Sequence, residues 1–554
     1  MPIKPALSAI SSDAFSRLSP AEQIDVLRCQ DAQQKTRFLL DAENGAELMA
    51  QLSTQEVYLL AVERGPEHLP ELLSLATPEQ WSGFIDLDCW DDDHFDSTKT
   101  HRWLIALLQG EEETAFTVLR EMNFEQLVLI FKSEMDIPSG PEADENSDAR
   151  IDAIKRDGGY EICYHTENGA KLFHKILDVL QSYEPEFFVY LLEAVRAETM
   201  GLIEESVYQQ RTGRLLDMGI PEPFSARKIY SWLDPEEYRQ APSFKKIALG
   251  PCEGSAPGFT LTLVRPKGLL AAVLADGMSE ETAWEMASVV NKVMMADRVQ
   301  MGDIDQVSGV ISKVDAYLNL ALEWLAGQDV DAAKECLANC YGEDLFRLGF
   351  SLTLKLQRRA AAVSRTTVAP YLDHNARTCI AALNRKTPLF FEGVADATRG
   401  GKRLFASLAE IHAVDKWLVR IEIQRQLFED VLQFALPEPA LLDLSGCQPD
   451  QADEVTLVEF FLTSLANRLL GREFQPLPIA EEELAGLHGM VSQSGVLNPR
   501  LREETVKWLD SLAQGGGDFA SYCLDIWEDE FCSVGFEDID PRFVGGLIVR
   551  LAEL

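Results

Sequence analysis

Apolar side chains recur along much of this chain with the spacing of an α-helix. Positions four apart lie on one face of a helix, so each such run predicts a helix with one apolar side. The clearest runs are Leu172, Ile176 and Leu180, then Phe187, Leu191 and Val195, and later Val314, Leu318 and Leu322. We therefore expect an all-α protein.

The N-terminal part also repeats one signal for the start of a helix. A short polar residue stands three positions before Glu or Gln, so each of the two side chains can cap the backbone N–H of the other residue. The copies are Ser19 with Glu22, Ser53 with Glu56, Thr77 with Gln80, Asn123 with Gln126 and, further on, Asp234 with Glu237. This repetition, irregular in period, predicts stacked helical hairpins like an irregular α-solenoid over residues 1–136, an architecture that usually binds partners.

Breaks in the helical pattern suggest three domains and two linkers. Residues 137–150 are acidic and interrupted by proline and glycine, which predicts a flexible linker, and 437–451 is a proline-rich one. The expected domains are the helical repeat at 1–136, a larger central helical domain at 151–436 and a C-terminal helical domain at 452–554. We expect at most one or two short strands, and the alternation of Thr with apolar residues at Phe259 to Val264 fits one of them.

Composition and charge narrow the classes of function. The chain has 554 residues, 46% of them hydrophobic, and a formal net charge of −40, which opposes attraction to nucleic acid and anionic lipid. Its ten cysteines include no CxxC pair, and no apolar run approaches the roughly 20 residues that span a bilayer. The segment from Met1 to Phe15 lacks the continuous apolar stretch of a secretory signal. We expect a cytoplasmic protein without a transmembrane segment or a nucleic-acid partner.

One segment departs from the acidic background. From Arg347 to Arg403 there are eleven basic and three acidic side chains, a local charge of +8. One explanation is charge complementarity within the protein or between identical copies. The other is an acidic protein partner or a phosphate-bearing ligand, although no glycine-rich phosphate-binding loop accompanies the segment. If a partner binds here, charge reversal should weaken its capture in a salt-dependent way, at Arg358, Arg359, Lys402 and Arg403.

The densest group of potential metal ligands runs from Asp86 to His101. Its members are Asp86, Asp88, Asp91, Asp93, His94 and His101. Hard cations bind carboxylate oxygens and histidine adds a transition-metal option, so a metal-dependent hydrolase or a metal sensor is one hypothesis. The alternative is a solvated loop between two helices, anchored by Trp90 and Trp103.

Six short segments resemble a bacterial family that is catalogued only as a domain of unknown function. They read IDLDCW, GRLLDMG, NKV, LFRLGFS, PLFFEG and ANRLLG, at 85–90, 213–219, 291–293, 345–351, 388–393 and 466–471. The resemblance covers nearly the full length and implies a soluble, mostly helical bacterial protein without an assigned activity, cofactor or catalytic residue. The helix-start signals of residues 15–135 are also similar in style to the helical N-terminal regulatory domain of magnesium-transport proteins.

Together these features favour a non-enzymatic interaction or regulatory scaffold built on helical repeats. The expected partner is an unidentified protein, acidic where it meets the basic segment Arg347 to Arg403. No residue is assigned as a catalytic group, a cofactor ligand or a metal ligand, and no cofactor is expected. The alternative is the metal-dependent hydrolase or metal sensor that uses the cluster Asp86 to His101.

Overall fold

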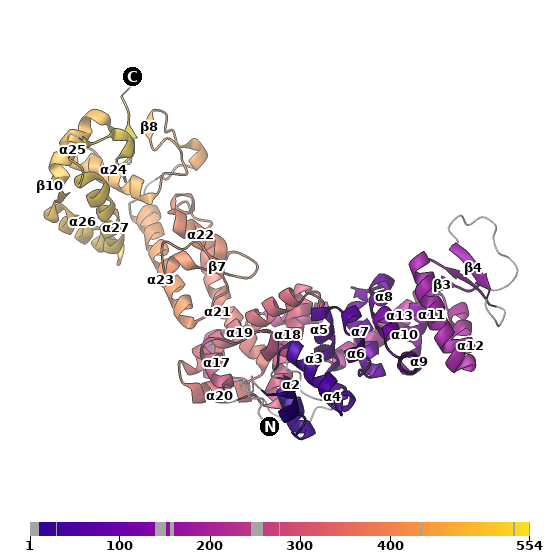
Figure 1. Cartoon of the computed structure of the whole chain (residues 1–554). Helices are drawn as coiled ribbons and strands as arrows, with labels where there is room; N and C mark the ends of the chain where they lie inside the picture. The colour runs from indigo at the N-terminus through magenta and orange to yellow at the C-terminus, as the bar shows by residue number, and fades with distance from the viewer. Residues whose placement is uncertain are drawn as a thin grey trace. The chain divides into compact units, whose positions relative to one another are not determined.

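The computed structural model divides the chain into two compact units, Met1–Gly349 and Phe350–Leu554, here called unit 1 and unit 2 (Figure 1). Helices dominate both units, which confirms the predicted all-α class. The described residues are 10–28, 30–138, 151–155, 160–244, 259–275, 277–432, 435–535 and 538–552.

Unit 1 begins with a series of short helices joined by tight turns. They are α1 (Ser12–Phe15), α2 (Pro20–Arg28), α3 (Ala32–Asp41), α4 (Gly45–Gln51), α5 (Thr54–Arg64), α6 (Pro70–Leu73), α7 (Pro78–Asp88), α8 (Ser97–Gln109), α9 (Glu112–Glu121) and α10 (Phe124–Lys132). Between α7 and α8 the strands β1 (Trp90–Asp91) and β2 (His94–Phe95) form an antiparallel hairpin. This hairpin carries part of the acidic segment that the sequence singles out.

Three of the predicted helix starts form the full reciprocal cap. The side-chain oxygens of Ser53, before α5, and Thr77, before α7, each accept a hydrogen bond from the backbone N–H of the third helical residue. The side chain of that third residue accepts a hydrogen bond from the backbone N–H of Ser53 or Thr77 in return. Ser19 exchanges the same two bonds with Glu22 at the start of α2. These helices begin where the sequence predicts because the cap depends only on residues that are close along the chain.

The other two predicted starts are capped by a single side chain. Asn123 accepts a hydrogen bond from the N–H of Gln126 at the start of α10, and Asp234 caps α15 (Pro235–Gln240). The amide of Gln126 reaches Ser82 and Asp86 of α7 rather than turning back to Asn123. A residue that the sequence assigns to a cap therefore connects two helices.

Aromatic side chains fill the core between α5, α7 and α8. Trp103 of α8 lies against Tyr58, Trp81 and Phe84, with ring centroids 5.9, 6.3 and 5.0 Å away. All four side chains are buried. Their packing fixes the end of α7 against the start of α8, where the candidate site is built.

The middle of unit 1 adds a small antiparallel sheet and three longer helices. The strands β3 (Met135–Asp136), β4 (Ile151–Lys155) and β5 (Glu161–Tyr164) lie in the order β3-β5-β4. The helices are α11 (Glu167–Tyr183), α12 (Pro185–Ala197) and α13 (Met200–Asp217), and α13 packs against α7 and α10 (Figure 1). The sheet joins both sides of the predicted linker, of which residues 139–150 lie outside the described residues.

The last part of unit 1 is helical, and one prediction fails there. Its helices are α14 (Pro223–Ala226), α15, α16 (Phe259–Leu263), α17 (Gly268–Leu274), α18 (Glu280–Asp297), α19 (Ile304–Ala326), α20 (Val330–Asn339) and the start of α21 (Gly342–Val363), which continues into unit 2. The strand predicted at Phe259 to Val264 is wrong, because this segment forms α16. Successive residues Phe259 and Thr260 are both buried, and α16 packs on α18 and α19, so burial does not alternate as it does along a half-buried strand.

Unit 2 continues with further helices and short strands. The helices are α22 (His374–Leu383), α23 (Leu408–Arg425), α24 (Leu457–Leu469), α25 (Leu484–Val491), α26 (Pro499–Leu512) and α27 (Gly516–Trp527). The strands are β6 (Phe390–Phe391), β7 (Lys402–Arg403), β8 (Cys447–Gln448), β9 (Ile479–Ala480), β10 (Ser492–Gln493), β11 (Val496–Leu497) and β12 (Val549–Arg550). They form the pairs β6-β7 and β10-β11 and the sheet β8-β12-β9.

The short strands are more numerous than the one or two that the sequence suggests, since two-residue strands leave no readable alternation. Within unit 2, β8 lies in the predicted linker 437–451 and pairs with β12. The division into three domains and two linkers stays a prediction.

None of the helices in the described part of the chain combines the length and the apolar composition needed to cross a membrane.

Candidate functional site

The acidic segment from Asp86 to His101 passes from the interior of unit 1 to its surface. Asp86 and Asp88 lie at the end of α7 and are buried. Asp91 and Asp93 are exposed on the β1–β2 hairpin, and the neighbouring side chain of His94 is 82% exposed. The structure therefore separates the residues that the metal hypothesis brings together.

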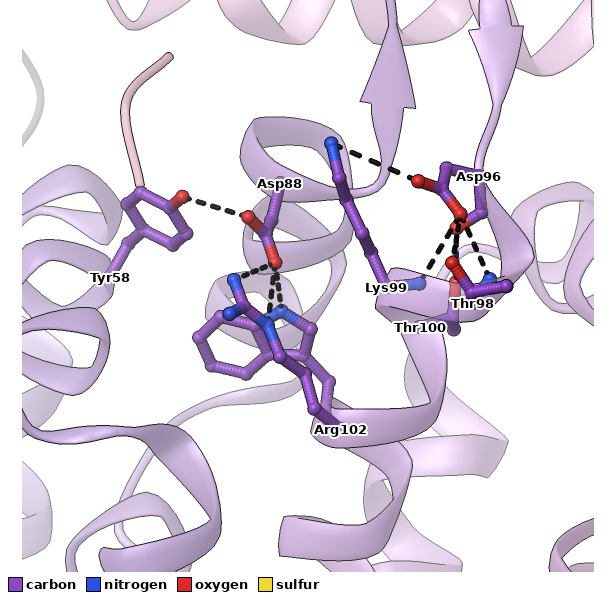
Figure 2. Close-up of polar contacts among 8 residues, drawn as sticks. Tyr58, Asp88, Asp96, Thr98, Lys99, Thr100 and Arg102 are labelled. Carbon is purple, nitrogen blue, oxygen red and sulfur yellow. Dashed lines mark hydrogen bonds and ion pairs between the residues drawn. The ribbon is translucent and has the colours of Figure 1, made fainter. Parts of the chain in front are cut away.

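Asp88 accepts hydrogen bonds from three side chains, two of which Figure 2 labels. The hydroxyl of Tyr58 donates to it at 3.1 Å, Nε of Arg102 at 3.0 Å and Nε1 of Trp103 at 2.8 Å. Burial, and then the charge of Asp88, raise the pKa of Tyr58, so the phenol stays protonated and remains a donor. Asp88 thus ties α5 to α8.

Asp86 joins α7 to α13 in a similar way. Arg214 donates two nearly parallel hydrogen bonds to it, with Nε to Oδ2 at 2.6 Å and Nη2 to Oδ1 at 2.9 Å. Nε2 of Gln126 adds a third at 2.9 Å. Burial raises the pKa of the Asp86 carboxyl, while the hydrogen bonds and the charge of Arg214 oppose that rise. This geometry gives Asp86 a structural role.

The turn of the hairpin faces a loop that follows α18. Asp92 and Arg298 both have left-handed backbone conformations, with φ of 53° and 56°, and Nη1 of Arg298 lies 3.6 Å from Oδ2 of Asp92. This pair is exposed, and such pairs contribute little to stability. The firmer anchor is Glu204 of α13, which accepts a hydrogen bond from the backbone N–H of Phe95 at 2.8 Å.

The two remaining side chains of the segment, Asp96 and His101, contact nearby residues of unit 1. Asp96 caps α8 by accepting bonds from the N–H groups of Thr98 and Lys99, and the ammonium of Lys99 lies 3.9 Å from it (Figure 2). His101 points to Glu134, with Nε2 and Oε1 at 3.0 Å. Across the residues that the structure describes, no three His, Cys, Asp or Glu side chains are grouped so that they could hold a metal ion.

A cleft of about 870 Å³ opens beside these residues in unit 1. Its walls come from the end of α7, the hairpin, the start of α8, α13, residues 220–223, the end of α18 and the loop 298–303. Small-molecule sites range from roughly 300 to 1,000 Å³, so the volume suits a small molecule or a short peptide segment. Four basic and six acidic residues line it, together with apolar side chains such as Leu215, Ile220, Met295 and Met301.

Arg211 of α13 is one of the cleft residues that sequence reasoning missed. Its Nε donates to the backbone oxygen of Asp86 at 2.8 Å, and its guanidinium carbon lies 5.2 Å from the centroid of the Trp90 ring. Burial lowers the pKa of Arg211. The sequence does hold one hint of this pair, because Arg211 and Arg214 are three residues apart and therefore lie on the same face of a helix.

The basic segment Arg347 to Arg403 is partly neutralised by nearby acids. In unit 2, Arg359 pairs with Asp415 and with Glu422, the latter at 3.0 Å. Arg403 pairs with Glu392 at 3.1 Å and Glu410 at 2.6 Å. These contacts fit the explanation by charge complementarity within the protein. Other members of the segment are exposed, among them Arg358 and Lys402.

Neither a curated protein nor a solved structure matches this chain. A family model described as a family of unknown function, DUF6178, matches residues 12–550, which confirms the predicted family resemblance over nearly the full length. The likeness in style to magnesium-transport proteins stays a prediction. On the extent of the family match, the chain belongs to DUF6178, a family of unknown function.

Proposed function

We propose that this protein is a non-enzymatic binding protein, an interaction or regulatory scaffold, and that its partner binds in the cleft of unit 1. The observation that carries the proposal is the cleft itself, which has the volume of a ligand site and mixed charged and apolar walls. The buried carboxylates of the segment, Asp86 and Asp88, already accept hydrogen bonds from other helices, Asp86 from Arg214 and Asp88 from Tyr58. This arrangement favours recognition over hydrolysis.

We further propose a cytoplasmic location. Eight cysteines of the described residues are free thiols, and seven of them are buried. Buried free thiols are typical of proteins kept in a reducing compartment, where disulfides are rare. A second surface for an acidic protein partner is the exposed part of the basic segment, including Arg358 and Lys402.

Site-specific photocrosslinking in the native host tests the proposed function. A benzophenone amino acid replaces Asp91, which is exposed on the cleft wall, in the full-length chain. The matched control places the same group at Glu482, an exposed acid of unit 2. We expect a discrete crosslinked product from position 91 only. Identical products from both positions, or none from position 91, would contradict the proposal.

Metal analysis of the same purified protein addresses the alternative function. A metal-dependent hydrolase or sensor that uses Asp91 and His94 predicts a stoichiometric divalent metal, which replacement of both residues by Ala removes. We expect no such Asp91- and His94-dependent metal. Its presence would favour the metal-dependent alternative over a scaffold.

A further inference from the structure

We propose that the cleft of unit 1 binds its ligand through a carboxylate group that pairs with the guanidinium of Arg211. This inference rests on the proposed function, because it names the chemistry of the molecule that the cleft takes. Its basis is an imbalance of charge at the wall formed by α7 and α13.

Behind that wall the carboxylate of Asp86 faces two guanidinium groups, and of these three side chains only Arg211 lines the cleft. Arg214 occupies both oxygens of Asp86, at 2.6 and 2.9 Å. Arg211 reaches only the backbone oxygen of Asp86, at 2.8 Å through Nε. Within the described residues, Arg211 forms no ion pair, and its Nη1 and Nη2 groups donate no hydrogen bond. Asp86 is therefore the counter-charge of both guanidinium groups, and the three side chains together carry one excess positive charge.

The surroundings of Arg211 act on that charge in two directions. The guanidinium lies over the ring of Trp90, a cation–π contact that favours the cation, whereas burial disfavours the cation and lowers the pKa of Arg211. A partly buried charge is destabilising unless it is paired or hydrogen-bonded. The unused N–H groups form a planar fork that matches the two oxygens of a carboxylate. An incoming carboxylate would supply both the missing charge and the missing acceptors.

The rest of the cleft favours a carboxylate over a phosphate. Six acidic residues line it against four basic ones, and Asp91, Asp92 and Asp93 stand on the hairpin at its edge. A phosphate group near neutral pH carries close to two negative charges and would meet more repulsion than a carboxylate, which carries one. The apolar side chains of Leu215, Ile220 and Met301 would contact an apolar body. The ligand is therefore a carboxylate on an apolar body, either a small organic acid or the C-terminus of an apolar peptide segment.

Calorimetric titration of the full-length protein tests this inference with defined probes. The small-molecule arm uses 3-phenylpropionate, its neutral amide and phenyl phosphate. The peptide arm uses the tripeptide Ala-Leu-Phe with a free or an amidated C-terminus, so that the two sources of a carboxylate are distinguished. We expect binding by at least one free carboxylate, and weaker binding by its amide and by phenyl phosphate.

Two arginine variants give the decisive comparison. Arg211→Met should weaken binding of the carboxylate probe by roughly ten- to a hundredfold, the range for a lost hydrogen bond to a charged group. The matched control is Arg239→Met, because Arg239 also lies over an indole, that of Trp324 at 5.3 Å, but is not part of the cleft wall. Equal loss in both variants, no loss in Arg211→Met, or no binding of either carboxylate to the unmodified protein would overturn the inference.

Thermal unfolding without ligand separates a binding role from a structural one. Arg211→Met removes one hydrogen bond to the backbone oxygen of Asp86 and the contact with Trp90 but no ion pair, so its loss of stability should stay well below that of Arg214→Met. A loss as large as that of Arg214→Met would assign Arg211 a structural role and overturn the inference. If Arg211→Met does not fold, Arg211→Lys, which keeps the charge but not the fork, should still weaken carboxylate binding.

Combining the titration with the crosslinking experiment distinguishes the two proposals. A product from position 91 that persists in Arg211→Met would support the scaffold but overturn the carboxylate contact. Arg211-dependent binding of a carboxylate probe, without any crosslinked protein, would support the contact and contradict the protein scaffold.

Discussion

Asp86 of α7 and Arg214 of α13 are 128 positions apart in the chain and form a two-bond ion pair, with N–O distances of 2.6 and 2.9 Å. Replacing Arg214 with Met leaves the buried Asp86 carboxylate without its main partner. Breaking a buried pair in this way typically costs roughly 3 to 5 kcal/mol, so we expect a loss of that order in the free energy of unfolding. Urea unfolding followed by tryptophan fluorescence measures it.

The control for this prediction is a carboxylate of the same segment that lies on the surface. Asp93 is 68% exposed, so Asp93→Asn should change the free energy of unfolding by no more than about 0.5 kcal/mol. A comparable loss in Arg214→Met and Asp93→Asn would contradict a structural role that is specific to Asp86 and Arg214.

The hydrogen bond from Tyr58 to Asp88 gives a second prediction. Tyr58→Phe removes a donor at 3.1 Å from a buried carboxylate. Hydrogen bonds to charged groups contribute about 1.5 to 3 kcal/mol, and we expect a loss near the lower end because Arg102 and Trp103 remain. Tyr190→Phe, at a side chain 61% exposed, is the control and should be neutral in the same unfolding measurement. Equal losses of unfolding free energy in Tyr58→Phe and Tyr190→Phe would contradict a stabilising hydrogen bond from Tyr58 to Asp88.

These contacts mark the boundary of what the sequence could predict. The helix starts at Ser53 and Thr77 were predictable because each cap joins residues three positions apart. The contact of Arg211 with Asp86 joins residues 125 positions apart, and only the packing of α13 on α7 creates it. The spacing of Arg211 and Arg214 places both on one face of a helix, but it does not indicate that this face packs on α7.

The acidic segment shows the same limit of sequence-based prediction, here for residues that are close along the chain. A dense run of Asp and His suggests a shared site, but residues that are adjacent in the chain need not converge. At the end of a helix, Asp86 and Asp88 point to different partners, Arg214 and Arg102, while the hairpin carries Asp91 outward. The sequence shows which residue types are present, but it does not show in which direction each side chain points.

Asp315 on α19 predicts a dependence of stability on pH. Burial raises its pKa to about 7, from an ordinary value of 3.8. The folded protein therefore holds a proton that the unfolded chain releases, and the stability that this provides below pH 4 is lost as the pH rises through 7. At about 1.4 kcal/mol for each pKa unit, the full effect is roughly 4 kcal/mol.

Asp315→Asn isolates this contribution because the amide does not titrate. Relative to the unmodified protein, the free energy of unfolding of Asp315→Asn should therefore increase as the pH rises from 4 to 8. Measuring urea unfolding at several pH values checks this. Two parallel stability curves would contradict the prediction.

The basic segment predicts different effects for paired and exposed residues. Arg359→Glu should destabilise unit 2 by about 1 kcal/mol or more, because it replaces two attractive contacts, with Asp415 and Glu422, by repulsive ones. Charge reversal at the exposed Lys402 should leave the free energy of unfolding nearly unchanged. If an acidic partner binds this segment, Lys402→Glu should weaken its capture in low salt. Unchanged capture would remove the segment as a partner surface.

Two glycines in long helices should respond in opposite directions to the same substitution. At Gly349 of α21 a Cβ would lie 1.9 Å from the backbone oxygen of Tyr317 in α19, so Gly349→Ala must push the two helices apart. We expect a loss of roughly 1 to 3 kcal/mol, the usual cost of overpacking. At Gly309 of α19 nothing lies within 4 Å of the added atom, and Gly309→Ala should stabilise by about 0.5 to 1 kcal/mol because alanine loses less backbone entropy. Thermal unfolding of the two variants should therefore show shifts of opposite sign, and shifts of the same sign would contradict the close contact between α19 and α21.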